Sequence, residues 1–495
     1  MLLSQNSQPH ALVILDGFGL SNNPHYNAVQ QAKTPLLDTL KLSYFYTELD
    51  ASGEHVGLPE GYVGNSEVGH LTIGCGRIIP QSLTALNTIT LPDHLVNNPT
   101  FIFLLHDYYK KNHPRIHLIG MISDEGIHSH IQHMKNILET IQLLNNDAEV
   151  VLHYILDGRD ALPRSALSYI LHIEQSINPL KVSVGSVHGR FYAMDRDNNQ
   201  NRTEKSGTLF TKKNPPYSGS IKDYLEEQYK THSTDEFIEP CSFIENHTIA
   251  PQDIVIFTNY RLDRIVQLAA YIDQQVKPYH IITPVPYPSI PSTSLYSPQN
   301  ITNGLIATLS KNNKTIFSIA ETEKHAHISY FFNGGTAQTY NNEQRVFIPS
   351  HKEQSFADNP EMSAREITQA VLDSLEQDPC DFYLINYANA DMVGHSGDLQ
   401  ATIKAVECLD RQISILYEKI VKQQQGTLFI TADHGNAEEM LHEQENEPNS
   451  SHTKNKVPFF AINAQNDVKK MQGLKDIAPC ILQEMNIQIP EEMIT

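Results

Sequence analysis

The segment Val150–Asp160 reads Val-Val-Leu-His-Tyr-Ile-Leu-Asp-Gly-Arg-Asp, an apolar run that ends abruptly in charged residues. A short apolar run bounded by turn residues predicts a buried strand. The cluster Asp157-Gly158-Arg159-Asp160 that follows it is typical of a loop that carries catalytic or binding groups. This pattern of strand and polar cluster is the one on which the rest of the chain is built.

The same pattern recurs along the whole chain, with helical patterns between many of the runs. Leu409, Ile413, Leu416 and Ile420 form one apolar stripe, which predicts a helix facing the core. Alternating strands and helices predict an α/β fold with parallel sheets, whose sites lie at the carboxyl ends of the strands. The other apolar runs are Ala11–Leu15, Ile116–Ile122, Val182–Val187, Ile254–Phe257, Thr315–Ile319, Phe382–Ile385 and Leu428–Thr431.

Length and composition limit the class of protein. The chain has 495 residues, which is too long for one compact core and predicts two or three domains. Its formal net charge of −21 argues against nucleic acid and an anionic membrane surface as partners. The five cysteines are scattered without a C-x-x-C motif, and no signal peptide or apolar span is apparent. We therefore expect a cytoplasmic protein.

Two changes in composition indicate where one domain is inserted into another. Pro284–Pro298 contains five prolines and several serines, which predicts a stiff linker. An earlier crossing is expected just after Gly76-Arg77, where the apolar pattern starts afresh. We predict one domain made of residues 1–82 and 299–495, and an inserted α/β domain of residues 83–298.

A glycine-rich stretch, Gly64-Asn65-Ser66-Glu67-Val68-Gly69-His70, is the candidate for a nucleophile. Glycines on both sides of Ser66 allow a tight turn that would expose its hydroxyl. The spacing differs from the G-x-S-x-G elbow, so a bound metal is the obvious means of lowering the pKa of this serine. An ordinary glycine-rich loop is the alternative interpretation.

Residues suited to metal binding fall outside the insert. Asp391 and His395 are four residues apart, so both point to one side of a helix or tight turn. Aspartate and histidine without cysteine predict an open catalytic site for Mn²⁺, Zn²⁺ or Mg²⁺. The other candidates end or flank predicted strands; they are Asp16, Asp433, His434 and His452, the last just before the apolar run Val457–Ile462.

The arginines at strand ends fall inside the insert. Their planar forks match the oxygens of phosphate and carboxylate. The alternative is that they pair with neighbouring aspartates, which the sequence allows at 159/160, 196/197 and 263/264. The metal ligands and the serine would then lie in one domain and an anion-binding cluster in the other. The arginines are Arg159, Arg190, Arg196, Arg261 and Arg264.

Together these motifs carry a specific resemblance over nearly the full chain. The sequence resembles the cofactor-independent (2,3-bisphosphoglycerate-independent) phosphoglycerate mutases of the alkaline phosphatase superfamily. Besides the stretches quoted above, the matching motifs are Leu15-Asp16-Gly17-Phe18-Gly19, His128-Ser129-His130, Gly189-Arg190-Phe191-Tyr192-Ala193-Met194-Asp195-Arg196-Asp197, Glu321-Thr322-Glu323-Lys324, Pro360-Glu361-Met362-Ser363 and Ala432-Asp433-His434-Gly435-Asn436. The chain departs from the family pattern at Tyr62-Val63, Glu125, Gln200 and Leu262, and it has no tryptophan.

The resemblance implies an alkaline-phosphatase-like domain that carries two Mn²⁺ ions, with Mg²⁺, Zn²⁺ or Co²⁺ as alternatives, and no 2,3-bisphosphoglycerate. One ion would be held by Asp16, Ser66, Asp433 and His434, and the other by Asp391, His395 and His452. The insert would bind the glycerate moiety, with Lys324 touching the phosphoryl group. The implied glycerate ligands are His128, Arg159, Asp160, Arg190, Arg196, Arg261 and Arg264.

The activity implied is the interconversion of 3-phosphoglycerate and 2-phosphoglycerate through a phosphoserine on Ser66, with Asp160 or His128 as proton shuttle. A metal-dependent phosphatase, a sulfatase or a phosphopentomutase of the same superfamily is one alternative. A non-enzymatic metal- or phosphate-binding protein is another. We expect a monomer that acts on a small molecule, without nucleic acid or membrane partners.

Overall fold

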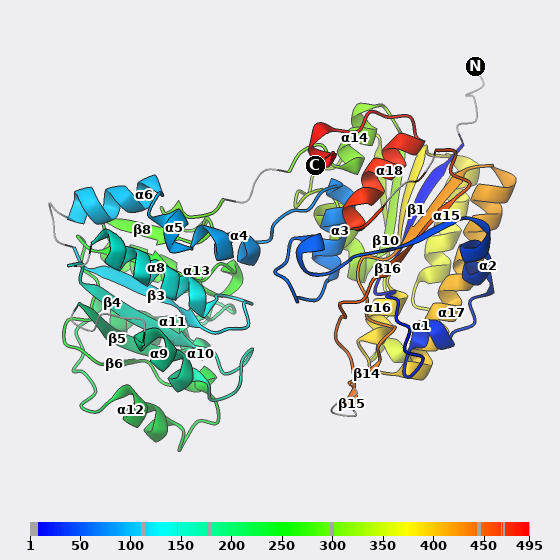
Figure 1. The fold of residues 1–495 in the computed structure, drawn as a ribbon. Helices are drawn as coiled ribbons and strands as arrows, with labels where there is room; N and C mark the ends of the chain where they lie inside the picture. Colours follow the sequence, from blue (N-terminus) through cyan, green and yellow to red (C-terminus); the bar gives the residue numbers. More distant parts are fainter. Residues whose placement is uncertain are drawn as a thin grey trace. The chain divides into compact units, whose positions relative to one another are not determined.

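The computed structural model describes residues 8–109, 114–145, 147–175, 181–297, 301–442, 447–466, 468 and 471–494. The chain forms two compact units, each with its own sheet (Figure 1). Unit 1 combines Met1–Pro80 with Asn300–Thr495, and unit 2 is the continuous stretch Gln81–Gln299. The predicted boundary between residues 298 and 299 lies outside the described residues.

Unit 1 is built on a seven-stranded sheet with the order β11-β10-β12-β1-β13-β16-β2. The strands from β11 to β13 pair in parallel, and β16 and β2 add to one edge in antiparallel fashion. A separate two-stranded ribbon joins β14 (Leu441–His442) to β15 (Glu447–Pro448). The sheet strands are β1 His10–Leu15, β2 Phe45–Leu49, β10 Ile316–Glu321, β11 Glu343–Ile348, β12 Phe382–Tyr387, β13 Thr427–Thr431 and β16 Val457–Ile462.

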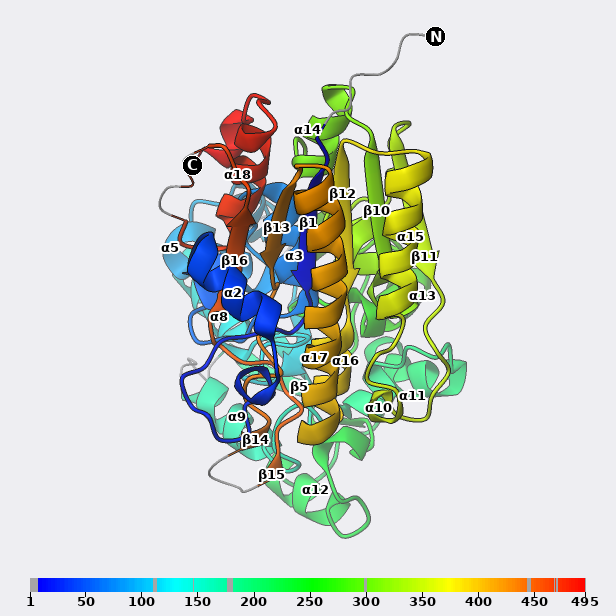
Figure 2. The same cartoon turned by 90° about the vertical axis from the view of Figure 1, so that its right-hand side faces the viewer.

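Helices cover both faces of this sheet, which is why its central strands are continuous apolar runs. Helices α2, α15 and α17 lie over one face, and α3, α14 and α18 lie over the other (Figures 1 and 2). The predicted stripe is confirmed: Leu409, Ile413 and Leu416 in α17, and Ile420 just beyond it, are fully buried. The helices are α1 Ala28–Gln31, α2 Pro35–Ser43, α3 Ser66–Cys75, α14 Leu305–Lys311, α15 Ala364–Gln377, α16 Asn389–Gly394, α17 Leu399–Leu416 and α18 Ile477–Glu484.

Unit 2 repeats this plan with a second seven-stranded sheet, in the order β6-β5-β4-β3-β7-β8-β9. All of its pairs are parallel except β5 with β6. Its strands are β3 Ile116–Ile122, β4 Val150–Leu156, β5 Val182–Gly189, β6 Cys241–Ser242, β7 Ile254–Phe257, β8 His280–Thr283 and β9 Thr293–Ser294.

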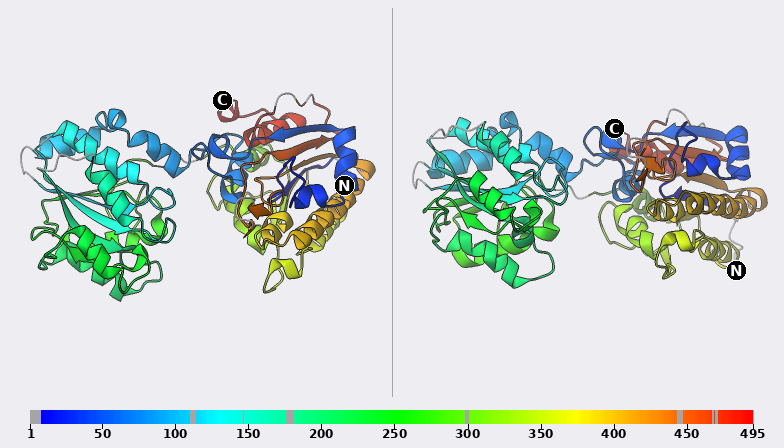
Figure 3. Two further views of the ribbon diagram at one scale, coloured as in Figure 1. Left: turned by 60° about the horizontal axis from the view of Figure 1, so that its bottom comes forward. Right: turned by 90° about the horizontal axis from the view of Figure 1, so that it is seen from below.

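The helices of unit 2 pack on both faces of its sheet (Figure 3). Side chains of α8 and α9 join those of β3 and β4 in one apolar core. The helices are α4 Ser82–Ile89, α5 Pro92–Leu95, α6 Pro99–Ile102, α8 Ile131–Leu144, α9 Ala166–Glu174, α10 Arg190–Ala193, α11 Gln200–Thr211, α12 Ile221–Gln228 and α13 Val266–Val276. The predicted class is therefore confirmed as α/β with two mostly parallel sheets.

The other face of the unit 2 sheet holds a row of polar side chains, which we call the imidazole row. It runs across three strands to α11, and each member is at most 1% exposed. The donor and acceptor atoms of consecutive members lie between 2.6 and 3.1 Å apart. Phe210 stacks on the imidazole of His188, with 4.8 Å between the ring centroids. In order the row is Asp253, His117, His153, Ser186, His188 and Ser206.

The linker prediction for Pro284–Pro298 is wrong for its described part. Thr293–Ser294 forms β9 beside β8, and the buried Tyr287 donates a hydrogen bond to the backbone oxygen of Asn259. The described part of this segment thus belongs to unit 2 and adds a strand to the edge of its sheet, and Pro298 itself lies outside the described residues.

The structure also describes the cysteines and the apolar character of the helices. All five cysteines are free, in agreement with the absence of a disulfide framework. Within the described part of the chain, we find no helix with the length and apolar character needed to span a bilayer.

Candidate active site

Polar side chains that follow neighbouring strands of unit 1 lie together at one end of the sheet. Asp16 directly follows β1, Asp433 closely follows β13, and Asp391 lies in α16 just after β12. Lys324 ends the one-turn helix Thr322–Lys324 after β10. Since β10, β12, β1 and β13 are adjacent and parallel, their carboxyl ends meet and gather these groups into one cluster.

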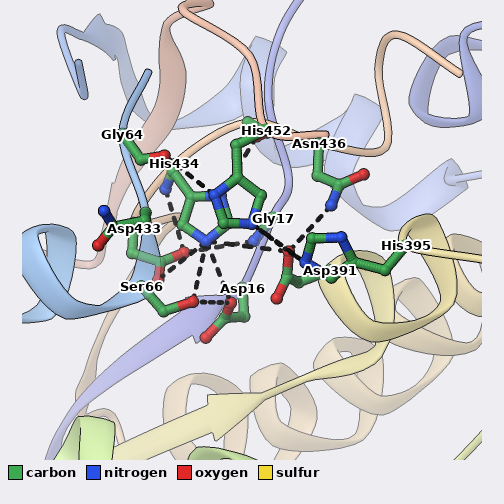
Figure 4. A network of polar contacts seen from close by, with 12 residues as sticks. Asp16, Gly17, Gly64, Ser66, Asp391, His395, Asp433, His434, Asn436 and His452 are labelled. Carbon is green, nitrogen blue, oxygen red and sulfur yellow. Dashed lines mark hydrogen bonds and ion pairs between the residues drawn. The ribbon is translucent and has the colours of Figure 1, made fainter. Parts of the chain in front are cut away.

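Ser66 lies in this cluster as the first residue of α3, whose preceding Asn65 accepts a hydrogen bond from Val68 N. Its hydroxyl donates to Asp16 Oδ1 at 3.0 Å and lies 3.0 Å from His434 Nε2 (Figure 4). The side chain is buried rather than exposed on a loop, which corrects the prediction. The glycine spacing serves close packing: a Cβ at Gly69 would lie 2.4 Å from the backbone oxygen of Asp433.

Three carboxylates and two imidazoles near the hydroxyl form two groups that could each hold a metal ion. The first group is Asp16, Asp433 and His434, and the second is Asp391, His434 and His452. His434 therefore belongs to both groups, whereas the resemblance assigned it to the first ion only. His395 lies beside the second group, with Nε2 at 3.2 Å from Asp391 Oδ1.

The burial of these carboxylates fits divalent cations. Asp16, Asp391 and Asp433 are at most 2% exposed, and Lys324 is the cation that pairs with the first two, at 2.6 Å each. Asp433 Oδ2 accepts no hydrogen bond from the described residues, although His70 Nδ1 lies 3.0 Å from it. Uncompensated buried charge is costly, and oxygen and nitrogen donors suit Mn²⁺, Mg²⁺ or Zn²⁺. The donor set thus matches a dinuclear metal centre.

The charges of this cluster perturb one another strongly. Burial alone would raise the pKa of Asp16, but the Lys324 ammonium holds it well below its usual range. Lys324 shows the converse, because Asp16 and Asp391 raise its pKa against the effect of burial. The Asp433 and Asp16 carboxylates likewise overcome burial and raise the pKa of His434 to about 10. Such mutual perturbation is typical of a functional site.

Further polar groups hold the cluster together, and the sequence analysis assigned them no role. Asn436 Nδ2 donates to Asp391 Oδ1 at 3.0 Å, and Gly17 N donates to Asp433 Oδ1 at 3.3 Å. Gly17 has a φ of +74°, and a Cβ there would lie 2.6 Å from Asp391 Cα. His70 and Asn386 are also buried here. A strand end or a quoted motif contains each of them, which was the available signal.

In unit 2, Arg190 is the centre of a second polar cluster at the carboxyl ends of strands. It is 2% exposed, and its NH1 lies 2.6 Å from Asp157 Oδ1 and 2.5 Å from Asp160 Oδ2. Asp157 also accepts hydrogen bonds from Ser123 Oγ and from the backbone nitrogen of Asp160. Asp157 therefore fixes both the arginine and the loop that carries Asp160.

His128 lies against the other side of this arginine, with Nε2 at 3.0 Å from Arg190 NH2. Burial and the arginine charge lower its pKa to about 4, so the ring is neutral. A guanidinium only donates, so Nε2 must accept and the ring proton must lie on Nδ1. That buried Nδ1 has no hydrogen-bond partner among the described residues. His128 thus keeps one donor unused.

The other arginines are more exposed. Their ion pairs differ in part from the pairs with neighbouring aspartates that the sequence allowed. Arg159 pairs with Glu236 at 3.4 Å rather than with Asp160, and Arg261 pairs with Asp263 at 3.3 Å. The pair of Arg196 with Asp197, at 4.0 Å, is the expected one.

Arg264 shows that the arginines crowd together. Its pKa is lowered by burial and by the positive charges of Arg190, Arg196 and Arg159. Guanidinium groups gathered in this way favour a bound anion with several oxygens. This arrangement can hold a carboxylate or a phosphate.

Comparison with known proteins finds similar chains that match this one over nearly its full length. Residues 8–489 match the model of the Metalloenzyme superfamily. The chain is similar to proteins named 2,3-bisphosphoglycerate-independent phosphoglycerate mutase from Clostridium tetani, at 39% identity over 99% of this chain and 98% of the relative, and from Clostridium novyi, at 40% over 98% of each. A solved phosphoglycerate mutase of Leishmania mexicana, at low cobalt concentration, aligns with 99% of this chain and 97% of its own, at 27% identity and a TM-score of 0.66.

Proposed function

This chain belongs to the 2,3-bisphosphoglycerate-independent phosphoglycerate mutases and interconverts 3-phosphoglycerate and 2-phosphoglycerate, and we propose that it does so through a phosphoserine at Ser66. The resemblance predicted from the sequence is confirmed, and the phosphatase and phosphopentomutase alternatives are not favoured. The observation that carries the proposal is the position of Ser66 Oγ, which lies 3.0 Å from Asp16 Oδ1 and 2.8 Å from Lys324 Nζ.

The enzyme depends on a divalent metal, as a member of the Metalloenzyme superfamily with a matching cluster of ligands. We propose two Mn²⁺ ions, with Asp16, Ser66, Asp433 and His434 for one and Asp391, His395 and His452 for the other. When bound, such ions lower the pKa of the serine hydroxyl and offset negative charge on the transferred phosphoryl group.

The chain's own groups prepare the first transfer. Ser66 Oγ donates its hydrogen bond to Asp16 Oδ1, so its proton already points to a carboxylate when the oxygen attacks phosphorus. Lys324 Nζ, 2.8 Å from that oxygen, places a fixed positive charge where the phosphoryl oxygens arrive. Transfer leaves a phosphate ester on Ser66 and glycerate in the site.

The second transfer requires that glycerate stays bound while its 2-hydroxyl replaces its 3-hydroxyl. We propose that unit 2 (Gln81–Gln299), which corresponds to the predicted insert of residues 83–298, holds it. The arginines proposed to bind it are Arg159, Arg190, Arg196, Arg261 and Arg264. Asp160 and His128, both held by Arg190, are the candidate proton shuttles because one carries a carboxylate oxygen and the other a free Nδ1–H. Unit 1, Met1–Pro80 with Asn300–Thr495, corresponds to the predicted domain of residues 1–82 and 299–495 and would perform the phosphoryl chemistry.

The proposal includes three properties that follow from the family and not from the site. The enzyme requires no 2,3-bisphosphoglycerate, acts as a monomer and works in the cytoplasm. A mutase assay coupled to enolase, without added 2,3-bisphosphoglycerate, tests the first of these. Gel filtration with light scattering tests the second.

Covalent trapping tests the phosphoserine. Rapid acid quench after mixing with phosphate-labelled 3-phosphoglycerate should leave label on the peptide that contains Ser66. Ser66→Ala should carry none, and label elsewhere on the chain would contradict the proposal.

A further inference from the structure

Below the nucleophile lies a buried pair, His70 and Asn386, that the reaction scheme above does not use. His70 is one turn after Ser66 on α3, and Asn386 is on β12; neither is accessible to solvent. His70 Nδ1 lies 2.9 Å from the backbone oxygen of Ser66. Asn386 Nδ2 lies 2.9 Å from His70 Nε2 and 2.9 Å from Asp16 Oδ2.

The chemistry of these groups fixes where each proton lies. Carbonyl and carboxylate oxygens only accept, and an amide nitrogen only donates, with two protons. Asn386 therefore donates one proton to Asp16 Oδ2 and the other to His70 Nε2. The imidazole of His70 must then carry its proton on Nδ1, which lies 2.9 Å from the backbone oxygen of Ser66 and 3.0 Å from Asp433 Oδ2. A flipped Asn386 amide would place its oxygen against the Asp16 carboxylate, so Nδ2 must be the atom that faces both Asp16 and His70. Asn386 Oδ1 is buried and has no hydrogen-bond partner among the described residues.

The contacts form a closed ring. Asp16 Oδ1 accepts from Ser66 Oγ, and Asp16 Oδ2 accepts from Asn386. Asn386 donates to His70, and His70 donates back to the backbone of Ser66. These contacts thus connect the main chain of the nucleophile with the carboxylate that accepts the hydrogen bond of its hydroxyl. They fix the rotation of Asp16 and the position of the first turn of α3 together.

We propose that His70 and Asn386 are positioning residues, which hold Ser66 Oγ and Asp16 in the one mutual orientation that phosphoryl transfer requires. The inference rests on the proposed role of Ser66 as nucleophile. It predicts a loss of kcat with little change of KM, because the glycerate anchors proposed above lie in unit 2 and are untouched. It also predicts weaker metal binding, because Asp16 is a proposed ligand and groups that orient ligands typically contribute about 10- to 100-fold.

Variants of similar size separate the contacts made by Asn386 from those made by His70. Asn386→Leu removes both donors at similar volume. His70→Gln keeps an acceptor near the position of Nε2, and His70→Asn keeps a donor near the position of Nδ1. A matched control is Thr72→Val in the same helix, because buried Thr72 Oγ1 donates to Val68 O at 2.8 Å, also one turn back, but contacts no group of the site.

The experiment measures kcat and KM for 3-phosphoglycerate, and Mn²⁺ affinity by titration calorimetry of metal-stripped protein. We expect Asn386→Leu to lower kcat by about 10- to 100-fold, to change KM by less than about twofold and to weaken Mn²⁺ binding about 10-fold. The two His70 variants, which each keep one contact and guard against misfolding, should lie between Asn386→Leu and wild type. Thr72→Val should match wild type in all three quantities.

The inference is overturned if Asn386→Leu and both His70 variants behave as Thr72→Val does, or if KM rises while kcat and Mn²⁺ affinity stay unchanged. Ser66→Ala, assayed in parallel, separates this failure from that of the proposed function. Activity retained by Ser66→Ala would refute the phosphoserine route. Full activity in the ring variants beside an inactive Ser66→Ala would refute only the positioning role.

Discussion

Units 1 and 2 both bury polar side chains beside a seven-stranded sheet, but they do so with different chemistry. Unit 1 buries charges: Asp16, Asp391 and Asp433 around Lys324. Unit 2, in its imidazole row, buries groups that stay neutral apart from Asp253 at one end. Charge in an interior requires a counter-charge, whereas a neutral ring requires only a suitable tautomer. The stability of unit 1 should therefore depend on bound metal ions, and that of unit 2 should depend on pH.

The largest expected effect concerns the nucleophile of unit 1. Ser66→Ala removes the phosphoryl acceptor, so both mutase activity and any slow hydrolysis should fall by about 10⁴-fold or more. The loss of one oxygen should leave the thermal unfolding of both units nearly unchanged. The enolase-coupled assay and a phosphate-release assay measure the two rates. Hydrolysis that persists in this variant would show that phosphorus is attacked by another group.

Metal removal should affect the two units unequally. Chelation should abolish activity, and Mn²⁺ should restore it best, because the ligands are oxygen and nitrogen only. Metal at 100 times its Kd stabilises the protein by about 2.7 kcal/mol, and this contribution should appear in unit 1 alone. Hydrogen exchange with and without chelator, read separately for each unit, measures it. Equal loss of protection in both units would break the comparison.

Arg261→Ala should affect unit 2 without removing the phosphorylation chemistry. Phosphoserine should still form, but glycerate should escape, so the mutase rate should fall by about 10²- to 10³-fold while hydrolysis rises as a fraction of turnovers. The partition of labelled product between 2-phosphoglycerate and free phosphate measures this. Arg365→Ala, at an exposed pair with Glu361 in unit 1, is the control. A proportional fall of both products would mean that unit 2 does not retain the glycerate.

The smallest effect concerns the acid stability of unit 2. Burial lowers the pKa of His153, and it lowers that of His188 to about 3. Below the unfolded value of about 6.5 the unfolded chain binds more protons, so stability is present above that pH and is lost as pH falls towards the folded pKa. At pH 5 the loss is about 2 kcal/mol for His188, and His153 adds to it in the same direction.

Hydrogen exchange of unit 2 between pH 7 and pH 5 measures this loss. His188→Gln should make the dependence shallower by about 1 kcal/mol per pH unit over this range, since one titrating imidazole is removed. Replacement of the exposed His94 by Asn should leave the dependence unchanged. A variant slope equal to that of wild type would show that His188 does not titrate on unfolding.

The sequence predicted the central strands well and the edges poorly, for a physical reason. Ile116–Ile122 and Val150–Leu156 were located to the residue because parallel strands covered on both faces are unbroken apolar runs. The edge strands β2 and β11 are partly exposed and carry polar residues, so they lacked that signal. The described part of Pro284–Pro298 was wrongly predicted to be a linker, because proline content alone does not distinguish a linker from a segment at the edge of a sheet.

The candidate site shows a similar division. Groups that follow a strand, such as Asp16 and Arg190, could be located because strand ends converge. The roles of His70 and Asn386 could not, because each role is defined by a contact that spans 316 residues of sequence. The exposure of Ser66 was wrongly expected for the same reason: the groups that cover it come from distant parts of the chain.

The position of β1 between β12 and β13 has a consequence for synthesis. β1 is synthesised before the whole of unit 2, yet both strands that flank it come after residue 380. At about 5 to 20 residues per second, β1 remains without its neighbours for tens of seconds. Unit 2, a continuous stretch that ends before residue 300, is complete in that interval. The chain therefore finishes its inserted unit first, and the nucleophile's unit closes only when its last strands emerge.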